Sequence, residues 1–253
     1  MYLSKLLLNP TNSRVREDLS DCQRMHNTVM SGFPSSGESD GVARSKYSVL
    51  YRIEANDREQ SIVLLVQSAV RPYWDHLVAN GYLAASSLGE ENPAVKCNDE
   101  QISPITDGMV LRFRLKANPT KKVGTSSKTD RLSGAPKNNG RRVFIETPDA
   151  QIDWLVRKGR ISGFELLAVS VSPGVPDVAV GGQTTETGLK RIGDVRDKSS
   201  LAVKTHRLTF RGVVFEGHLK VTDEKAFKAA LIKGIGSGKA YGFGLLSVAP
   251  GGR

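Results

Sequence analysis

Two features of this sequence could carry out chemistry: a glycine-rich stretch near its end and a histidine near its beginning. Residues 233–244 contain five glycines spread over eleven positions, with Lys239 among them. Glycine has no side chain to keep another backbone away, so the amides of such a stretch can converge on an anion. Phosphate is the obvious anion. The alternative is a glycine-rich helix cap that leads into a crowded strand.

Two stricter phosphate-binding motifs do not fit the glycine-rich stretch. Gly234 and Gly236 lack the third glycine of the dinucleotide-binding fingerprint, and the predicted order is helix, loop, strand. Gly238 and Lys239 are followed by Ala240, so the hydroxyl with which a P-loop holds magnesium is missing. The stretch is therefore a phosphate-binding candidate outside both nucleotide-binding motifs.

The histidine that could transfer protons is His26, because an unperturbed imidazole titrates with a pKa of about 6.5. A helix predicted from residue 12 carries apolar side chains at positions 15, 19, 22, 25 and 29. On an unbroken helix His26 falls within that apolar arc, and a hydrogen-bonded core histidine is the simpler interpretation. The alternative is that Ser20 and Asp21 cap a restarted helix, which would turn His26 towards a cleft.

The charge of the chain indicates a polyanionic partner. The formal net charge is +10 and the sequence pI is about 9.7, and nucleic acid fits this excess best. With 253 residues the chain suits two ordinary domains, although one larger domain fits as well. A hydrophobic fraction of 39% argues against global disorder.

Targeting and metal-binding signals are not expected. The apolar run at the beginning is too short for a signal peptide, and no later run reaches membrane-spanning length, so we expect a cytoplasmic protein without a membrane partner. Cys22, Cys97 and the four scattered histidines have no metal-ligand spacing. We therefore expect neither a metal site nor a cofactor.

The first half of the chain predicts the order strand, helix, strand, strand, helix. Strands are predicted over residues 2–9, 47–54 and 62–66, and helices from residue 12 and over residues 72–79, with Pro72 in the first turn of the second. Residues 33–48 are rich in glycine, serine and charge and predict a mobile loop. Residues 84–103 supply a last strand and a linker. This order predicts a ferredoxin-like, βαββαβ domain over residues 1–95 and a linker over residues 96–106.

The second half repeats this order and predicts a second ferredoxin-like domain over residues 107–253. Its predicted elements are strands over residues 109–116, 143–145, 164–171, 201–221 and 245–250, a hairpin arm over residues 172–200, a helix from Thr147 and a helix over residues 221–232 capped by Thr222. The fold class is therefore α+β, with two tandem ferredoxin-like (RRM-like) domains, a C-terminal glycine-rich loop and a basic hairpin.

Much of the positive charge is concentrated in one segment. Residues 112–142 hold ten Lys or Arg side chains and one acid, Asp130. Residues 120–140 are also rich in serine, glycine and asparagine and predict a loop that an anion would order. A solvated charge run would explain disorder but not this local excess. Arg157 and Lys158 end a helix, where cations either complement the helix dipole or bind phosphate.

Six segments of the sequence resemble the CasE (Cse) family, the pre-crRNA endoribonucleases of type I-E Cascade within the RAMP superfamily of repeat-associated RNA-binding proteins. The segments are MYLSKLLLNP at residues 1–10, Met25-His26, LLVQS at residues 64–68, RFRLKANP at residues 112–119 with Lys121, Trp154-Leu155, and GIGSGKAYGFGLLSVAP at residues 234–250. The first and last segments are specific to the family, and the resemblance extends from end to end of the chain.

The resemblance implies a metal-independent endoribonuclease that cuts CRISPR repeat stem-loops in pre-crRNA on the 3′ side. The RNA's own 2′-hydroxyl attacks the adjacent phosphate and leaves a 2′,3′-cyclic phosphate and a 5′-hydroxyl. The catalytic histidine of the family falls on His26. Family members stay bound to the cleaved stem, so the expected partners are the repeat RNA and other Cascade subunits, in particular the backbone subunit.

The expected RNA-binding residues come from the basic segments, the family's helix and hairpin positions, and the glycine-rich stretch. They are Arg112, Arg114, Lys116, Lys121, Lys122, Arg157, Lys158, Lys190, Arg191, Arg196, Lys198, Gly236, Gly238 and Lys239.

One position departs from the family pattern. Members often have a tyrosine three residues before the histidine, and here that residue is Gln23. Tyr47, Tyr51 or Lys239 could take the tyrosine's place, and the sequence does not choose among them. Gln23 also favours a rival function, a non-catalytic subunit of Cascade that binds the crRNA hairpin. A second rival is an RNA chaperone, which would bind unrelated RNAs as tightly as a hairpin.

Overall fold

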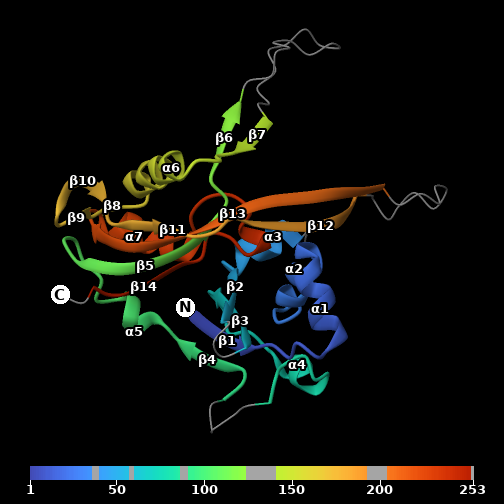
Figure 1. The fold of residues 1–253 in the computed structure, drawn as a ribbon. Helices are drawn as coiled ribbons and strands as arrows, with labels where there is room; N and C mark the ends of the chain where they lie inside the picture. Colours follow the sequence, from blue (N-terminus) through green and yellow to red (C-terminus); the bar gives the residue numbers. More distant parts are fainter. Residues whose placement is uncertain (36–39, 57–59, 86–90, 124–140, 193–203, 252–253) are drawn as a thin grey trace.

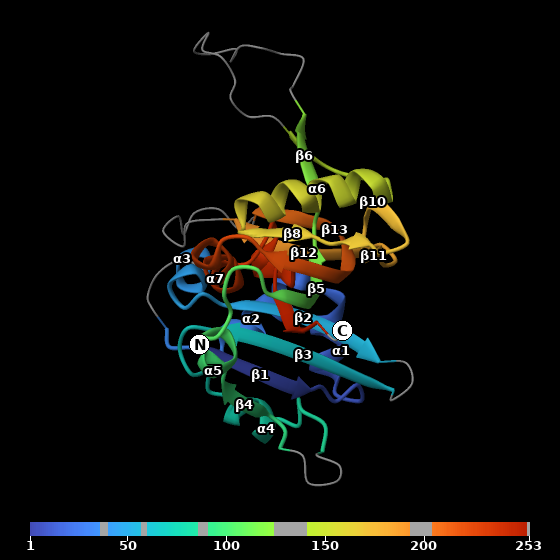
Figure 2. The same cartoon turned by 90° about the vertical axis from the view of Figure 1, so that its left-hand side faces the viewer.

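The computed structural model describes residues 1–35, 40–56, 60–85, 91–123, 141–192 and 204–251. The chain folds into two halves, each built from an antiparallel sheet with helices packed on one face (Figure 1). In the view turned by 90°, the second half lies above the first (Figure 2). Side chains of both sheets, among them Arg52 and Arg114, line one cleft between the halves.

The first sheet has the strand order β2-β3-β1-β4, and every neighbouring pair is antiparallel. This order, with helices between β1 and β2 and between β3 and β4, is that of a ferredoxin-like unit. The elements of this half are β1 (Tyr2–Leu7), α1 (Ser13–Ser20), α2 (Cys22–Met30), α3 (Asp40–Lys46), β2 (Leu50–Asn56), β3 (Ser61–Ser68), α4 (Asp75–Ala79), β4 (Ala94–Cys97) and α5 (Asp99–Ile102).

The second sheet repeats the arrangement, with the order β11-β13-β5-β14, and β8 and β12 pair with β13 as well. The predicted α+β class with two ferredoxin-like units is therefore confirmed. The elements are β5 (Val110–Ala117), β6 (Thr120–Val123), β7 (Arg141–Phe144), α6 (Pro148–Ile161), β8 (Phe164–Leu166), β9 (Ala168–Val169), β10 (Ser172–Pro176), β11 (Val178–Val180), β12 (Thr184–Ile192), β13 (Lys204–Val221), α7 (Glu224–Lys233), the 3-10 helix η1 (Lys239–Tyr241) and β14 (Leu246–Pro250).

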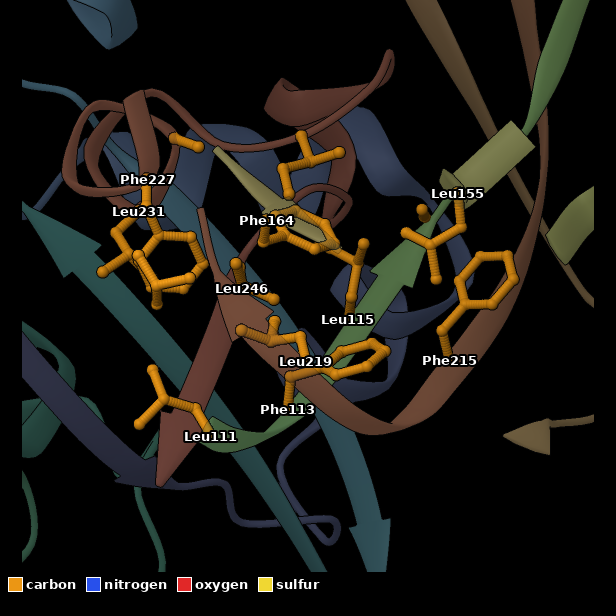
Figure 3. Close-up of a cluster of buried hydrophobic side chains, with 14 of the residues drawn as sticks. Leu111, Phe113, Leu115, Leu155, Phe164, Phe215, Leu219, Phe227, Leu231 and Leu246 are labelled. Carbon is orange, nitrogen blue, oxygen red and sulfur yellow. The ribbon is translucent and has the colours of Figure 1, made fainter. Parts of the chain in front are cut away.

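Each half has its own hydrophobic core, because alternate strand residues point to the helix-covered face of each sheet. In the second half Leu111, Phe113 and Leu115 of β5 lie in the core with side chains from α6 and α7 (Figure 3). The residues between them, Arg112 and Arg114, point to the opposite face, which lies towards the first sheet. The side-chain pattern of this one strand thus separates a core from a polar cleft.

The long strand β13 changes its partner half-way along. Residues 204–212 pair with β12, and residues 213–220 pair with β5. Gly212 lies at the change, and a Cβ atom there would lie 2.3 Å from the Phe243 ring. Because glycine has no side chain, the strand can cross closely over Phe243 of the glycine-rich loop at this point. Beyond the crossing, it extends with β12 over α1 and α2 (Figure 1).

A buried arginine joins the two halves. Arg52 of β2 is 3% exposed and donates hydrogen bonds to the carbonyl oxygens of Arg114 and Leu245, at 3.2 and 3.0 Å. It also donates to the Ser247 hydroxyl at 3.0 Å and to the Glu54 carboxylate at 2.8 Å. A buried guanidinium whose hydrogen bonds are satisfied on both sides fixes the relative position of the sheets.

Several predicted elements of the first half differ from the structure. The segment predicted as a mobile loop, residues 33–48, contains α3, and residues 36–39 lie outside the described residues. Pro72 precedes α4, which begins at Asp75, because Trp74 occupies the cap position. The strand β4 spans the predicted boundary at residue 95, and α5 lies in the predicted linker. The division into residues 1–95 and 107–253 stays a prediction.

In the second half the helix α7 is capped by Asp223, whose side chain accepts from the Ala226 amide at 2.9 Å, and not by Thr222. The strand predicted over residues 164–171 is interrupted at Leu167, which bonds to the His218 carbonyl between β8 and β9. The short strand predicted over residues 143–145 is β7, which pairs with β6 in a separate arm. Of the loop predicted over residues 120–140, Thr120–Val123 instead form β6, and residues 124–140 lie outside the described residues.

We expect Arg52→Ala to lower the free energy of unfolding by on the order of 3 kcal/mol, because two buried carbonyls lose their donors. Denaturation in urea, followed by circular dichroism, measures this loss. The control is Arg71→Ala at an exposed arginine, which should stay within about 0.5 kcal/mol of the unaltered protein. Equal stability of the two variants would show that Arg52 does not join the halves.

Candidate functional site

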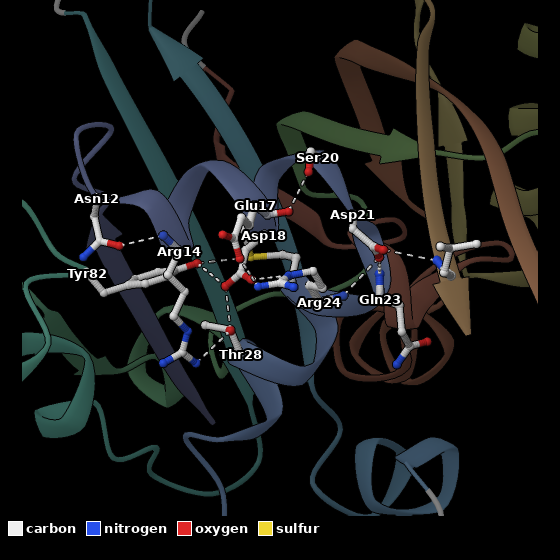
Figure 4. Close-up of polar contacts among 12 residues, drawn as sticks. Asn12, Arg14, Glu17, Asp18, Ser20, Asp21, Gln23, Arg24, Thr28 and Tyr82 are labelled. Carbon is white, nitrogen blue, oxygen red and sulfur yellow. Dashed lines mark hydrogen bonds and ion pairs between the residues drawn. The ribbon is translucent and has the colours of Figure 1, made fainter. Parts of the chain in front are cut away.

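The helix that carries His26 is a restarted helix. The first helix ends at Ser20, and Asp21 has an extended backbone with φ −136°. Its carboxylate accepts hydrogen bonds from the amides of Gln23 and Arg24, at 2.8 and 3.2 Å, and so caps α2 (Figure 4). The structure therefore has the capped restart that was the alternative to one unbroken helix.

The hairpin strand β12 lies on the start of α2. The second carboxylate oxygen of Asp21 accepts a hydrogen bond from the Leu189 amide at 3.2 Å. At the preceding residue, Gly188, a Cβ atom would lie 2.6 Å from the Asp21 carboxylate and 2.9 Å from Cys22 Sγ. Only glycine permits this approach, and the Asp21 carboxylate that caps α2 also accepts a hydrogen bond from the hairpin.

Buried polar contacts hold α1 against α2. The Asp18 carboxylate accepts hydrogen bonds from the Thr28 hydroxyl at 2.7 Å and from the Tyr82 hydroxyl at 2.9 Å (Figure 4). Burial, and secondarily the negative charge of Asp18, raises the pKa of Tyr82 above its ordinary value, which already keeps the hydroxyl protonated at neutral pH. These contacts stiffen the helix pair on the side of α2 where Tyr82 lies.

His26 is 3% exposed, yet it lies directly against the glycine-rich loop. Its ring is 5.9 Å from the ring of Tyr241, measured between centroids, in an edge arrangement with an interplanar angle of 60°. The Tyr241 hydroxyl donates to Gln23 Oε1 at 3.1 Å, and Gln23 Nε2 donates to Asn27 Oδ1 at 3.0 Å. The histidine and the glycine-rich stretch singled out from the sequence are therefore neighbours in space.

The glycine-rich loop needs its glycines for backbone conformation and for close approach. Gly236 and Gly238 both have positive φ, at 87° and 77°. A Cβ atom at Gly236 would lie 3.1 Å from the Trp154 ring, and one at Gly242 would lie 3.2 Å from the Tyr51 ring. The crowded-loop interpretation is therefore what the structure shows, while binding of an anion by the loop amides stays a prediction.

Lys239 in this loop stands among other cations. Partial burial, and then the positive charges of Arg44, Lys158 and Lys233, lower the pKa of Lys239. These neighbours come from three different helices, α3, α6 and the end of α7. Cations brought together in this way from distant parts of the chain would attract a phosphate group strongly.

Three of the predicted RNA-binding residues lie in other surroundings. Arg112 and Arg114 line the cleft between the sheets, whose wall also includes His218. Arg114 forms ion pairs with two carboxylates, one of them Glu216 at 2.9 Å. Lys116 forms an ion pair with Glu186 of β12 at 2.7 Å. The guanidinium of Arg114 and the ammonium of Lys116 are thus neutralised by carboxylates.

The remaining predicted cations are spread over the arm, the helix α6 and the hairpin. Lys121 and Lys122 are exposed on β6, Arg157 is exposed on α6, Lys190 is exposed on β12, and Arg191 also belongs to β12. Arg196 and Lys198 lie outside the described residues. The exposed members could reach an RNA that lies along this side of the molecule.

Neither tyrosine considered as a replacement at the Gln23 position contacts Gln23 in the described interactions. Tyr47 donates to the Pro34 carbonyl at 3.3 Å. Tyr51 is buried, its hydroxyl has no hydrogen-bond partner among the described residues, and burial raises its pKa well above the usual value. The tyrosine that does bond to Gln23 is Tyr241, which we did not predict, although its place between glycines was a visible signal.

Comparison with known proteins gives the family. A sequence model described as "CRISPR associated protein" matches residues 1–250. The CRISPR-associated endoribonuclease Cse3 of Thermus thermophilus is 32% identical over 250 residues, which cover 99% of this chain and 100% of the relative. The chain belongs to the CasE (Cse) family of CRISPR-associated proteins. The family resemblance seen in the sequence is thereby confirmed.

Other CasE family members extend the match. The Cascade subunit CasE of Escherichia coli is 25% identical over 250 residues, covering 99% of this chain and 100% of the relative. A structure of Thermus thermophilus Cse3, bound to an RNA representing a pre-cleavage complex, has a TM-score of 0.68 at 31% identity and covers 98% of each chain. The similarity therefore spans both halves.

Among the described residues there is neither a cluster of metal-ligand side chains nor a membrane-spanning helix. No group of three or more His, Cys, Asp or Glu side chains in this part of the protein could hold a metal ion together. Within the same ranges, no helix is both long and apolar enough to cross a membrane.

We expect Lys239→Met to raise the melting temperature of the RNA-free protein by about 1–3 °C, because partly exposed charge interactions are worth at most about 1 kcal/mol. A lowered pKa means that folding disfavours the ammonium, so removing the charge stabilises the protein at neutral pH. The gain shrinks as the pH rises through the pKa of Lys239, where the unaltered side chain also becomes neutral.

The matched control for this prediction is Lys225→Met at an exposed lysine of α7, which should leave the melting temperature within about 1 °C. Calorimetry at low ionic strength gives both values. A lower melting temperature for Lys239→Met than for Lys225→Met would mean that the neighbouring cations do not destabilise Lys239.

Proposed function

We propose that this chain is a metal-independent endoribonuclease that cuts CRISPR repeat stem-loops in pre-crRNA and stays bound to the product as a subunit of Cascade. The observation that carries the proposal is the contact of His26 with the glycine-rich loop, beside the cations around Lys239. A relative is named as an endoribonuclease, and its structure was solved with an RNA that represents a pre-cleavage complex.

The reaction needs three things that this arrangement supports. A 2′-hydroxyl must be held in line with the leaving 5′-oxygen, a group must move a proton, and charge on the phosphorane must be stabilised. Imidazole suits the proton transfer near neutral pH, so His26 is the proposed catalytic residue. Lys239 and Lys158 are proposed to stabilise the phosphorane.

The proposed partners follow from the same function. They are the repeat stem-loop RNA and other Cascade subunits. The relative from Escherichia coli is itself named as a Cascade subunit. Both relatives named above come from bacteria, where RNA transcripts are made in the cytoplasm, so we propose that this protein acts there as well. The exposed cations of the β6–β7 arm and of β12 are proposed to contact the phosphates of the stem.

We expect His26→Ala to lower the single-turnover cleavage rate about 10²- to 10⁴-fold, because proton transfer contributes that much to such reactions. The assay uses labelled repeat RNA from the CRISPR array of the source genome and looks for a 2′,3′-cyclic phosphate product. His218→Ala is the matched control: His218 lies in the inter-sheet cleft, 2.7 Å from the Asp177 carboxylate. If His218→Ala lost cleavage and His26→Ala kept it, the catalytic site would lie in that cleft and not at His26.

Cleavage should persist in EDTA, since the proposed mechanism uses the RNA's own hydroxyl and protein side chains. Loss of cleavage in EDTA that magnesium restores would reject this mechanism.

The rival function, a non-catalytic subunit that binds the crRNA hairpin, is favoured by Gln23 at the position where relatives often have tyrosine. Binding of repeat RNA with affinity that falls steeply as salt rises is expected under both functions. A cyclic-phosphate product separates them, because only the nuclease forms it. Equal affinity for unrelated RNAs would instead favour an RNA chaperone.

A further inference from the structure

The glycine-rich loop presents one rigid aromatic side chain to the His26 helix. Tyr241 ends the 3-10 helix η1, and its flanks Gly238 and Gly242 both have left-handed backbones. Its amide donates to the Gly238 carbonyl at 2.8 Å, which closes the turn. Its ring stacks on Phe210 of β13, with 4.8 Å between centroids and an interplanar angle of 26°. Backbone and ring are therefore both held.

Tyr241 makes two contacts with α2, one with His26 itself and one with Gln23, three residues earlier. Its ring meets the His26 ring at its edge, and its hydroxyl donates to Gln23 Oε1. Gln23 and His26 are three residues apart and so lie on the same side of the helix. The amide of Gln23 is fixed at both ends, because its Nε2 donates to Asn27, the residue that follows His26.

From this geometry we infer that Tyr241 is a positioning residue, which holds the His26 imidazole in its working orientation by ring contact and through Gln23. The inference rests on the proposed function of His26. An imidazole that moves a proton must be aimed, and a misplacement of about 1 Å can cost about 10²-fold in rate. The tyrosine also ties this orientation to the loop that carries Lys239, so histidine and cations stay in register.

A tyrosine that merely fills space would need its ring and not its hydroxyl. The hydroxyl of Tyr241 reaches an amide that is itself oriented, and this is the feature that ring packing does not require. Tyr241→Phe keeps the ring and removes this hydrogen bond, whereas Tyr241→Leu removes both contacts. The two substitutions therefore separate the two roles.

The experiment measures single-turnover cleavage and RNA affinity with the repeat hairpin of the source genome. Tyr241→Phe should slow cleavage about 2- to 10-fold, as expected for one neutral hydrogen bond. Tyr241→Leu should slow it about 10- to 100-fold. Affinity should stay within about twofold in both, because the lost interaction acts on the reaction and not on binding. In a Gln23→Leu background, Tyr241→Phe should change the rate less than about twofold.

The matched control is Tyr73→Phe, which removes a tyrosine hydroxyl from a side chain that is 71% exposed and lies outside the described site. It should leave the cleavage rate unchanged. The inference is overturned if Tyr241→Phe cleaves at the rate of the unaltered protein, if affinity falls as much as rate, or if the Gln23 and Tyr241 effects multiply.

A second readout does not depend on cleavage. With four histidines in the chain, the ring signals of His26 can be assigned in a ¹H–¹³C spectrum by comparison with His26→Ala. Tyr241→Leu should broaden or shift these signals, and Tyr241→Phe should retain the ring contact with His26. An unchanged His26 ring in Tyr241→Leu overturns the inference even if the unaltered protein cuts no RNA, an outcome that would reject only the proposed function.

Discussion

The close packing of the glycine-rich loop is the constraint on which the site depends. The loop lies against Trp154 of α6, Tyr51 of β2 and Phe210 of β13. A side chain at Gly236 would push the loop away from Trp154, and one at Gly242 would push it away from Tyr51. Without that approach, Tyr241 could not reach α2 and Lys239 could not stand beside the cations of three helices. Glycine here serves contact between distant elements as much as freedom of the backbone.

The basic side chains fall into two groups: some are paired with carboxylates, and others lie close to further cations. Arg114 and Lys116 are paired with carboxylates and contribute to structure. Lys239 is partly buried and also lies near other cations, and both circumstances oppose its charge in the folded protein. Such a cost is typical of functional sites, which keep an unfavourable arrangement that a ligand relieves. The excess of basic residues in the sequence was therefore a sound indication of a polyanion, but not a guide to which cations would bind it.

The fold was largely predictable, because alternating strands and apolar helix faces repeat in each half in the same order. The site was only partly predictable. His26 and the glycine-rich stretch stood out by residue type, but their contact spans most of the chain, and no local pattern contains it. The helix break at Asp21 determines where the His26 side chain lies, and the sequence indicated this break only as an alternative to one unbroken helix. The roles of Tyr241 and Arg44 were not predicted, because they depend on neighbours that only folding brings together.

The loop's late place in the chain has a consequence for how the protein is made. Gln23 and Tyr241 are 218 residues apart, and the first half, with its own hydrophobic core, leaves the ribosome long before the loop does. During that interval the emerging polypeptide contains the imidazole without its tyrosine, its lysine or the second sheet. Biosynthesis itself thus delays assembly of the RNA-cutting apparatus until nearly all of the protein has been translated.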